Sequence, residues 1–349
     1  MGDSYHLACV PGDGIGPEVV AEARKAVDAA AARFGFGVDW IDFDLGAERW
    51  LRTGEALPDV AVKELREADA ILLGAVGRPD VPPGVLERGL LLRLRFELDL
   101  YVNLRPVKLY PGVASPLAGV GPDDLDLLIV RENTEGAYVG MGGRFKKGTK
   151  DEVATQEDVN TFGGVTRIIE HAFQLARREV VMVDKSNAMT FAGGLWQERW
   201  KAVAAEHPHV KTRHLFVDAA AMQLVKDPSQ FEVIVTGNLF GDILSDLTAE
   251  LIGGMGIAPS ANINPITARG LFEPVHGTAP DIAGRGIVNP IGAILSAAMM
   301  VRHLGDPKMA DAIEGAVESA IRARECTRDI GGDMSTSQAG DAVVKRLKD

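Results

Sequence analysis

Strand-like and helix-like runs alternate along most of this chain of 349 residues, and the alternation restricts the folds open to it. Short aliphatic runs predict strands at residues 7–10, 70–74, 125–130, 180–183, 214–217 and 232–235. Longer runs with helical spacing predict helices at residues 17–34, 165–178, 194–207, 291–304 and 307–324. Strands that alternate with helices usually pair at least partly in parallel, so the pattern predicts an α/β fold.

Composition narrows the class of protein. A chain of this length can bury a large core and favours two domains over one. The net charge of −12 argues against nucleic acid as a main partner, although local arginines could still bind a small anion. No apolar run is long enough to span a bilayer, so we expect no membrane partner. Cys9 and Cys326 make no disulfide framework or metal motif, and residues 1–6 do not resemble a signal peptide, so we expect a cytoplasmic protein.

Two aspartates near the start of an expected helix are candidate metal ligands. Residues 231–235 resemble a strand, and the apolar spacing after Gly237 predicts a helix. Asp242 and Asp246 stand four residues apart, which places them on one helix face. Paired carboxylates suit Mg²⁺ or Mn²⁺. The alternative is that acidic side chains simply stabilise a helix N-terminus.

Charged residues end other expected strands in the same way. Arg131, Lys185 and Asp218 each follow a strand-like run, and ligands of α/β sheets bind at the carboxyl ends of strands. A partly desolvated lysine can serve as a general base, whereas an exposed Lys185 would be an ordinary surface residue. Asp218 could instead cap the helix that follows it.

Arginines gather in and near residues 92–105. Arg93, Arg95 and Arg105 lie there, and Arg131 follows further along the chain. Guanidinium groups bind carboxylates with two parallel hydrogen bonds. Beside a metal, such a cluster indicates a substrate with two or more carboxylates. The alternative is surface pairing with the many acidic residues.

Several glycine-rich or polar segments show no regular pattern. Residues 11–17 lack the GxGxxG spacing and predict a tight turn close to a ligand. Residues 273–281, with His276, could wrap a flat ligand, and Tyr138 lies in another expected loop, where tyrosines normally only pack. Residues 140–164 favour a flexible loop, with an exposed hairpin or an arm to a second subunit as alternatives.

Together these motifs resemble the isocitrate/isopropylmalate dehydrogenase family, the metal-dependent β-decarboxylating dehydrogenases of 2-hydroxy acids. The likeness runs along nearly the whole chain and is strongest at residues 103–106, 131–136, 184–187, 237–246 and 273–281. It implies a two-domain α/β architecture that is not a true Rossmann fold. Residues 1–100 and 254–349 would form the cofactor-binding domain with both termini. Residues 101–253 would form the central domain, which binds substrate and metal and makes a homodimer.

The resemblance also implies roles for individual side chains. Asp242 and Asp246 would hold Mg²⁺ or Mn²⁺ together with Asp218 of a second subunit, so that active sites are shared across the homodimer. Lys185, also from the partner, would act with Asp218 in removing the hydroxyl proton, and Tyr138 would protonate the enol after CO₂ leaves. The carboxylates of the substrate would be bound by Arg95, Arg105 and Arg131. The cofactor would be NAD, bound by His276, Gly277, Thr278, Ala279, Asp281 and Asn289.

Which 2-hydroxy acid a family member oxidises depends on the protein side chains that contact the γ-substituent of the substrate. Residues 85–92 resemble the segment of isopropylmalate-oxidising members, which implies that Glu87, Leu90, Leu91 and Asn187 contact an isopropylmalate side chain. The implied reaction is the NAD-dependent oxidative decarboxylation of 3-isopropylmalate. Ala188 and residues 133–136 keep tartrate, D-malate and homoisocitrate open as alternatives, and residues 90–95 are one residue longer than in some relatives. The remaining alternative is a binding-only subunit, which the intact set of candidate catalytic residues argues against.

Overall fold

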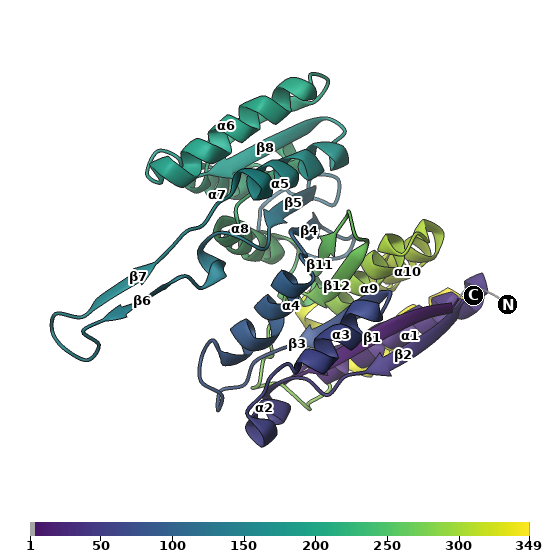
Figure 1. The fold of residues 1–349 in the computed structure, drawn as a ribbon. Helices are drawn as coiled ribbons and strands as arrows, with labels where there is room; N and C mark the ends of the chain where they lie inside the picture. Colours follow the sequence, from purple (N-terminus) through teal and green to yellow (C-terminus); the bar gives the residue numbers. More distant parts are fainter. Residues whose placement is uncertain (1–3, 349) are drawn as a thin grey trace.

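The computed structural model describes residues 4–348, which form one ten-stranded sheet with flanking helices (Figure 1). The strand order is β2-β1-β3-β12-β11-β4-β5-β10-β8-β9. The strands are β1 (Ser4–Gly12), β2 (Gly37–Asp42), β3 (Ala70–Ala75), β4 (Val102–Lys108), β5 (Asp126–Glu132), β8 (Glu179–Asp184), β9 (Lys211–Phe216), β10 (Val233–Thr236), β11 (Pro259–Asn264) and β12 (Arg269–Pro274). Pairing is parallel except in the ladders β12–β11, β11–β4 and β4–β5. The expected α/β fold with partly parallel strands is confirmed.

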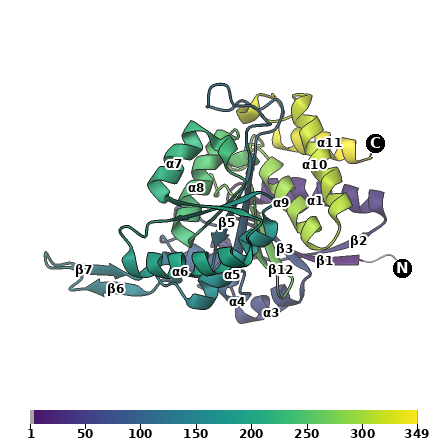
Figure 2. The same ribbon diagram turned by 90° about the horizontal axis from the view of Figure 1, so that it is seen from above.

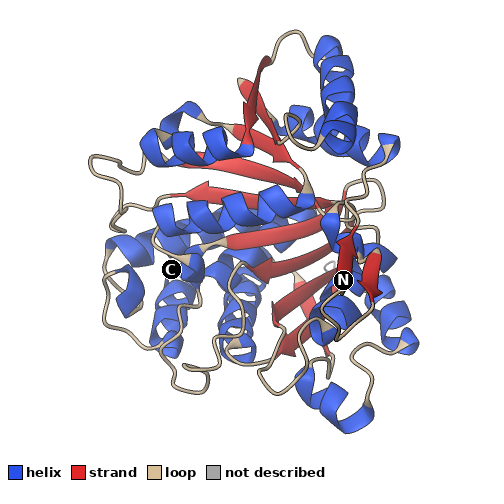
Figure 3. Cartoon of the chain, turned by 90° about the vertical axis from the view of Figure 1, so that its left-hand side faces the viewer, coloured by secondary structure: helices blue, strands red, loops and turns tan. Residues whose placement is uncertain are grey.

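Helices cover both faces of this sheet (Figure 3). They are α1 (Gly16–Phe34), α2 (Ala47–Thr53), α3 (Asp59–Glu67), α4 (Arg93–Glu97), α5 (Phe162–Leu175), α6 (Thr190–Glu206), α7 (Val217–Lys226), α8 (Asn238–Leu251), α9 (Ile291–His303), α10 (Pro307–Arg322) and α11 (Thr336–Lys348). Local sequence sets the ends of α1, because Pro17 fits the first turn and Gly35 adopts a φ of 82° after the last. Within residues 4–348, no helix is both long and apolar enough to cross a membrane.

Every expected strand and helix has a counterpart, with shifted ends. Val217 begins α7 instead of ending a strand, and the helix expected to reach Arg178 ends at Leu175. Four strands of the sheet were not among those expected from the alternation, namely β2, β4, β11 and β12. Strand β2 is a mostly exposed edge strand, and β11 contains a serine and two asparagines, so neither shows the aliphatic run on which the prediction relied.

Residues 140–164 are not the flexible loop that the composition favoured. They contain an antiparallel hairpin of β6 (Gly142–Phe145) and β7 (Val153–Gln156), which projects away from the sheet (Figures 1 and 2). Its residues are exposed, so the apolar alternation of a half-buried strand is missing from the sequence. The hairpin was one of the two alternatives, and residues from Phe162 onward already belong to α5.

The sheet has two halves that meet at one antiparallel ladder. Strands from residues 1–100 and 254–349 occupy the half from β2 to β11, and strands from residues 101–253 occupy the half from β4 to β9. The two halves join where β11 pairs with β4, a ladder of three residue pairs that we call the seam. The proposed division into two domains follows this boundary and remains a proposal.

Candidate active site

A solvent-open cleft is lined by residues from both halves of the chain, and the empty space in it, including the part open to solvent, is about 750 Å³. Its lining residues are Gly74, Ala75, Val76, Glu87, Leu91, Leu92, Arg95, Arg105, Arg131, Tyr138, Asp242, Glu273, Pro274, Val275, His276 and Gly277. Strand alternation explains how the sheet contributes to it: Arg105 on β4, Arg131 on β5 and Glu273 on β12 share the cleft face. The sequence-predicted arginines therefore lie together with one of the two predicted metal ligands.

The three arginines are buried and held in place by specific acceptors. Arg131 is 1% exposed and donates from Nη1 to Asp242 Oδ1 at 2.5 Å and from Nη2 to Asn238 Oδ1 at 2.7 Å. Arg105 donates from Nη1 to Ser245 Oγ at 3.0 Å. Burial lowers the pKa of Arg131 to about 9, and the neighbouring Arg105 adds to this shift. Several cations forced together in a desolvated cleft favour the binding of an anion with more than one charge.

Arg95 is the third arginine of the cleft and is held by a glutamate. Its side chain is buried, and its Nη2 donates to Glu273 Oε1 at 3.0 Å. Its Nε is also buried but has no hydrogen-bond partner within the part of the chain that the structure describes. Arg95 also lines the cleft, so its guanidinium belongs with those of Arg105 and Arg131 as a candidate for binding a carboxylate there. Arg93, by contrast, lies outside the cleft and pairs with Asp59, as the surface alternative predicted.

Asp242 and Asp246 lie in α8, within reach of two of these arginines. Burial alone would raise the pKa of Asp242, but Arg131 and the Tyr138 hydroxyl outweigh burial and hold the pKa below its ordinary value. Burial and the charge of Asp242 raise the pKa of Asp246. A divalent cation between the two carboxylates would relieve their repulsion, and hard oxygen donors of this kind suit Mg²⁺ or Mn²⁺. The pair therefore fits a metal chemically, although no group of three potential ligands gathers anywhere in residues 4–348.

Tyr138 is placed as a proton donor at the same carboxylate. It lies in a 3₁₀ turn (Ala137–Val139), and its hydroxyl donates to Asp242 Oδ2 at 2.6 Å. Burial and this hydrogen bond raise the pKa of Tyr138 to about 12, so the phenol keeps its proton at neutral pH. Its neighbour Arg131 lies 5.4 Å from the ring centre. The loop residue thus does more than pack.

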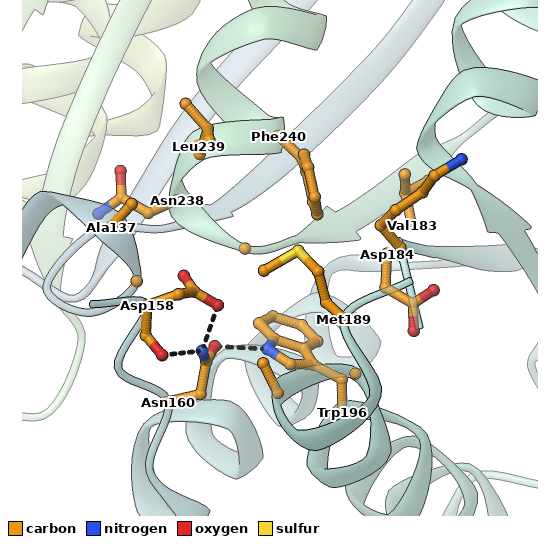
Figure 4. Close-up of a pocket in the computed structure, with 15 residues that line it drawn as sticks. Ala137, Asp158, Asn160, Val183, Asp184, Met189, Trp196, Asn238, Leu239 and Phe240 are labelled. Carbon is orange, nitrogen blue, oxygen red and sulfur yellow. Dashed lines mark hydrogen bonds between the residues drawn. The ribbon is translucent and has the colours of Figure 1, made fainter. Parts of the chain in front are cut away.

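Lys185 and Asp218 lie outside this cleft. Lys185 Nζ donates to Asp218 Oδ1 at 2.6 Å, and this bond lowers the pKa of Asp218. Lys185 follows β8 and lines a separate, mostly apolar hollow with Met189 and Trp196 (Figure 4). Within one chain, the pair of Lys185 and Asp218 therefore lies apart from the cleft that holds the arginines, Asp242 and Tyr138. Asn187, two residues after Lys185, is exposed and also absent from the cleft lining.

A π-helix decides which leucines reach the cleft. Residues Glu87–Leu92 form this wider turn, which accommodates one extra residue in a helix. Glu87, Leu91 and Leu92 line the cleft, whereas Leu90 is fully buried in the core below it. The expectation that Leu90 contacts substrate is therefore not supported by its position, and Leu92 occupies the place expected for it. The extra residue noted at 90–95 gives the physical reason.

The loop expected to bind the cofactor borders the cleft. His276 and Gly277 line it, and burial lowers the pKa of His276, whose Nε2 is buried without a partner among the described residues. The backbone of Thr278 accepts a hydrogen bond from Ile15 N–H at 2.9 Å, so the turn at residues 11–17 packs directly on this loop. A concave segment with an unsatisfied imidazole nitrogen fits a polar, flat ligand.

The other three expected cofactor residues differ in accessibility. Asp281 is exposed, with its carboxylate available to a ligand, and Ala279 is partly buried within the loop. Asn289 is buried, and its side chain is occupied: it donates to Asp329 Oδ2 at 2.9 Å and accepts from Ile291 N–H at 3.0 Å. Asn289 therefore offers a cofactor little more than its backbone.

Sequence reasoning missed the acceptors that hold the arginines. Glu273, Asn238 and Ser245 each contact one arginine, and Asn103 Oδ1 accepts from Arg105 Nε at 2.9 Å. All four lie in the segments of strongest family resemblance, residues 103–106, 237–246 and 273–281, but none of them was assigned a role from the sequence. A usable signal was the alternation of Asn103 and Arg105 on one strand, which places both side chains on one face.

The family model for isocitrate/isopropylmalate dehydrogenases matches residues 6–343 of this chain. The chain belongs to that family. It is 54% identical over 346 residues to the 3-isopropylmalate dehydrogenase of Thermobifida fusca strain YX, covering 98% of this chain and 97% of that protein. It is 51% identical over 345 residues to the 3-isopropylmalate dehydrogenase of Mycobacterium tuberculosis strain H37Rv, covering 98% and 99%.

Solved structures agree with this family membership. The isocitrate dehydrogenase from Methylococcus capsulatus superposes with a TM-score of 0.90 at 38% identity and covers 99% of this chain and all of that one. As a member of the isocitrate/isopropylmalate dehydrogenase family, the chain is a decarboxylating dehydrogenase that acts on a small substrate with a pyridine nucleotide and a divalent metal. The resemblance drawn from the motifs is confirmed, and so is the expected isopropylmalate dehydrogenase-like fold.

Proposed function

We propose that this enzyme oxidises and decarboxylates 3-isopropylmalate to 4-methyl-2-oxopentanoate and CO₂, a step of leucine biosynthesis. The names of its full-length relatives support this substrate. The observation that carries it in the structure is the pair Leu91 and Leu92, which lines the same cleft as the arginines. Burying an isopropyl group against such a wall contributes about 2 kcal/mol, or roughly thirtyfold in affinity.

The arginines define how the substrate lies. Arg95, Arg105 and Arg131, which all line the cleft, bind its two carboxylates. Held in this way, the departing carboxylate stays aligned with the bond that breaks. When bound at Asp242 and Asp246, a divalent ion would stabilise the negative charge that develops on the substrate oxygen, and NAD would accept the hydride.

Proton transfer falls to two different groups. Lys185 with Asp218 removes the proton of the substrate hydroxyl, since oxidation at that carbon requires its loss. Tyr138 keeps its proton at neutral pH and delivers it to the enol carbon after CO₂ leaves. Both groups must meet one substrate, yet they lie apart in one chain. A second subunit that brings Lys185 and Asp218 to the cleft resolves this separation.

Exposed apolar residues support a homodimer with shared sites. Met222 on α7 is 71% exposed, and Ile243 on α8 is 56% exposed. Large apolar side chains at this exposure on neighbouring helices mark an interaction surface. The apolar hollow beside Lys185 is lined by Leu239 and Phe240 at the start of α8, the helix that also carries Ile243 (Figure 4). The projecting hairpin β6–β7 offers a second contact with the same partner.

Subunit mixing tests the shared site. Lys185→Ala and Tyr138→Phe chains, each inactive alone, are expected to regain activity when refolded together, because one site of each heterodimer is intact. Refolded mixtures of either variant with itself are the controls. Heterodimers that form without any recovery would place both residues in the same subunit's site.

The cofactor is proposed to be NAD, with Mg²⁺ or Mn²⁺ as the metal. The exposed carboxylate of Asp281 can accept hydrogen bonds from ribose hydroxyls and would repel a 2′-phosphate. We also propose a cytoplasmic location, in keeping with two free, buried cysteines and no disulfide between them.

Product analysis tests the reaction itself. The purified enzyme with NAD, Mg²⁺ and 3-isopropylmalate is expected to release NADH, CO₂ and 4-methyl-2-oxopentanoate in equal amounts. An identical mixture without metal is the control. Formation of NADH without CO₂ would show an oxidation that stops before decarboxylation, and it would refute the proposed reaction.

A further inference from the structure

A buried network of side chains connects Arg95 to Arg105 across the seam. Arg95 Nη2 donates to Glu273 Oε1 at 3.0 Å, and Asn262 Nδ2 donates to the same oxygen at 2.9 Å. Asn262 Oδ1 accepts from Asn103 Nδ2 at 3.1 Å, and Asn103 Oδ1 accepts from Arg105 Nε at 2.9 Å. The path therefore runs from one substrate arginine to the other through three side chains.

Asn262 stands at the centre of this path and uses both ends of its amide. Its nitrogen binds Glu273, and its oxygen binds Asn103 and also Asn133 Nδ2 at 3.0 Å. Asn262 and Asn103 are fully buried and directly opposite in the short ladder that joins β11 to β4. The carboxamide supplies donors on its nitrogen and an acceptor on its oxygen, and Asn262 uses both.

We propose that Asn262 is a positioning residue that sets the placement of Arg95 relative to Arg105. It thereby determines how tightly the cleft binds the two carboxylates of the substrate. Arg105 lies on β4, on one side of the seam, whereas Arg95 lies on α4 and is bound to Glu273 of β12, on the other side. Their separation therefore depends on the seam. The amides of Asn262 and Asn103 each use both their oxygen and their nitrogen, so a displacement of either side chain breaks several buried hydrogen bonds at once. Asn262 itself does not line the cleft. The inference rests on the proposed role of these arginines in carboxylate binding.

The chain contains a matched control two residues away. Asn264 lies on the same strand and face, and it is also buried. Its side chain donates to the Asp99 carbonyl at 2.8 Å and accepts from the Ile266 and Thr267 N–H groups, so these hydrogen bonds do not involve Arg95 or Arg105. Loss of Asn264 thus removes a comparable number of side-chain hydrogen bonds, here partly buried ones, without touching the arginines.

The test compares Asn262→Ala and the isosteric Asn262→Asp with Asn264→Ala. Kinetics are measured with saturating NAD and varied 3-isopropylmalate, and thermal unfolding records the stability of each variant. Both Asn262 variants are expected to raise the KM for 3-isopropylmalate about tenfold or more. The reason is that misplacing one arginine that binds a carboxylate with two hydrogen bonds weakens substrate binding at least about tenfold. The kcat and the KM for NAD should stay within about threefold of the parent. Asn264→Ala should lose stability but keep its substrate KM.

Two results would overturn the proposal. One is a folded Asn262 variant with an unchanged KM, and the other is an equal rise in KM for Asn264→Ala. If neither Asn262 variant is soluble, Glu273→Gln tests the same path without altering β11. Glu273→Gln removes the negative charge that binds Arg95 and is expected to raise the KM for 3-isopropylmalate. An unchanged KM in this variant would contradict the proposal. If the parent enzyme does not oxidise 3-isopropylmalate, that result refutes the proposed function instead. The KM values of the Asn262 and Asn264 variants would then be compared for the diacid that the parent does oxidise.

Discussion

Gly241 is the position at which a single methyl group is expected to disturb substrate binding. It lies in the first turns of α8, and a Cβ added there would approach the Arg131 side chain to 2.5 Å at Cγ and 2.7 Å at Cβ. These atoms are next to the backbone and cannot swing away. Arg131 is buried and bound to Asp242 and Asn238, so its guanidinium must shift when the contact is relieved.

The size of the effect follows from two opposing contributions. Alanine in a helix is favoured over glycine by about 1 kcal/mol, and overpacking costs about 1–3 kcal/mol. We therefore expect Gly241→Ala to lower the free energy of unfolding by up to about 2 kcal/mol. A displaced Arg131 forfeits a charge-assisted hydrogen bond to a substrate carboxylate, about 1.5–3 kcal/mol, which is roughly a 10- to 100-fold rise in KM.

The assay pairs urea unfolding with kinetics at varied 3-isopropylmalate concentration. Gly315→Ala is the matched control, because Gly315 is exposed within α10 and an added Cβ there meets no atom within 4 Å. It should gain stability through helix propensity and leave KM unchanged. A folded Gly241→Ala protein with the parent's KM would refute the role assigned to Arg131.

Four further perturbations follow from the site and its surroundings. Tyr138→Phe should lower kcat by about 10²- to 10⁴-fold with little change in KM, measured by NADH formation, and comparable turnover would exclude Tyr138 as the proton donor. Chelation should abolish activity and Mg²⁺ or Mn²⁺ should restore it, with Asp246→Asn needing more metal for half-maximal rate. Replacing Asp281 by Lys and Ile282 by Tyr should erode the preference for NAD over NADP, which in the parent should be about two orders of magnitude. Burial lowers the pKa of His171 below the unfolded value of about 6.5, so the unfolded chain binds the proton more tightly than the folded one. The free energy of unfolding should therefore fall as the pH drops below about 6.5. Urea unfolding of His171→Leu should show a smaller fall over the same pH range.

Residues near the ends of strands were the most predictable part of the site. Arg131 at the end of β5, and Asp242 soon after β10, follow aliphatic runs, and parallel strands bring such residues to one edge. The spacing of Asp242 and Asp246 needed only the helix repeat. The buried position of each guanidinium was less predictable, because it depends on acceptors such as Asn238 that arrive from another element.

Features that depend on long-range pairing or on local irregularity escaped prediction. The seam joins Asn103 to Asn262, far apart in the sequence, and polar buried strands carry no aliphatic signature. The π-helix rotates Leu90 into the core and Leu92 into the cleft, a change that regular helical spacing cannot anticipate. The separation of Lys185 from Asp242 depends on the folded chain, so the sequence indicated a shared site only through the family resemblance.

The central claim, that the cleft recognises a branched aliphatic malate, is tested most directly by the ratio of kcat/KM values for 3-isopropylmalate and D-malate. The two substrates share both carboxylates and the hydroxyl, so they differ only in the group that meets Leu91 and Leu92. With NAD and saturating Mg²⁺, the ratio should favour 3-isopropylmalate by about thirtyfold or more. A ratio of one or less would contradict the account and place the enzyme with the D-malate-oxidising members of its family.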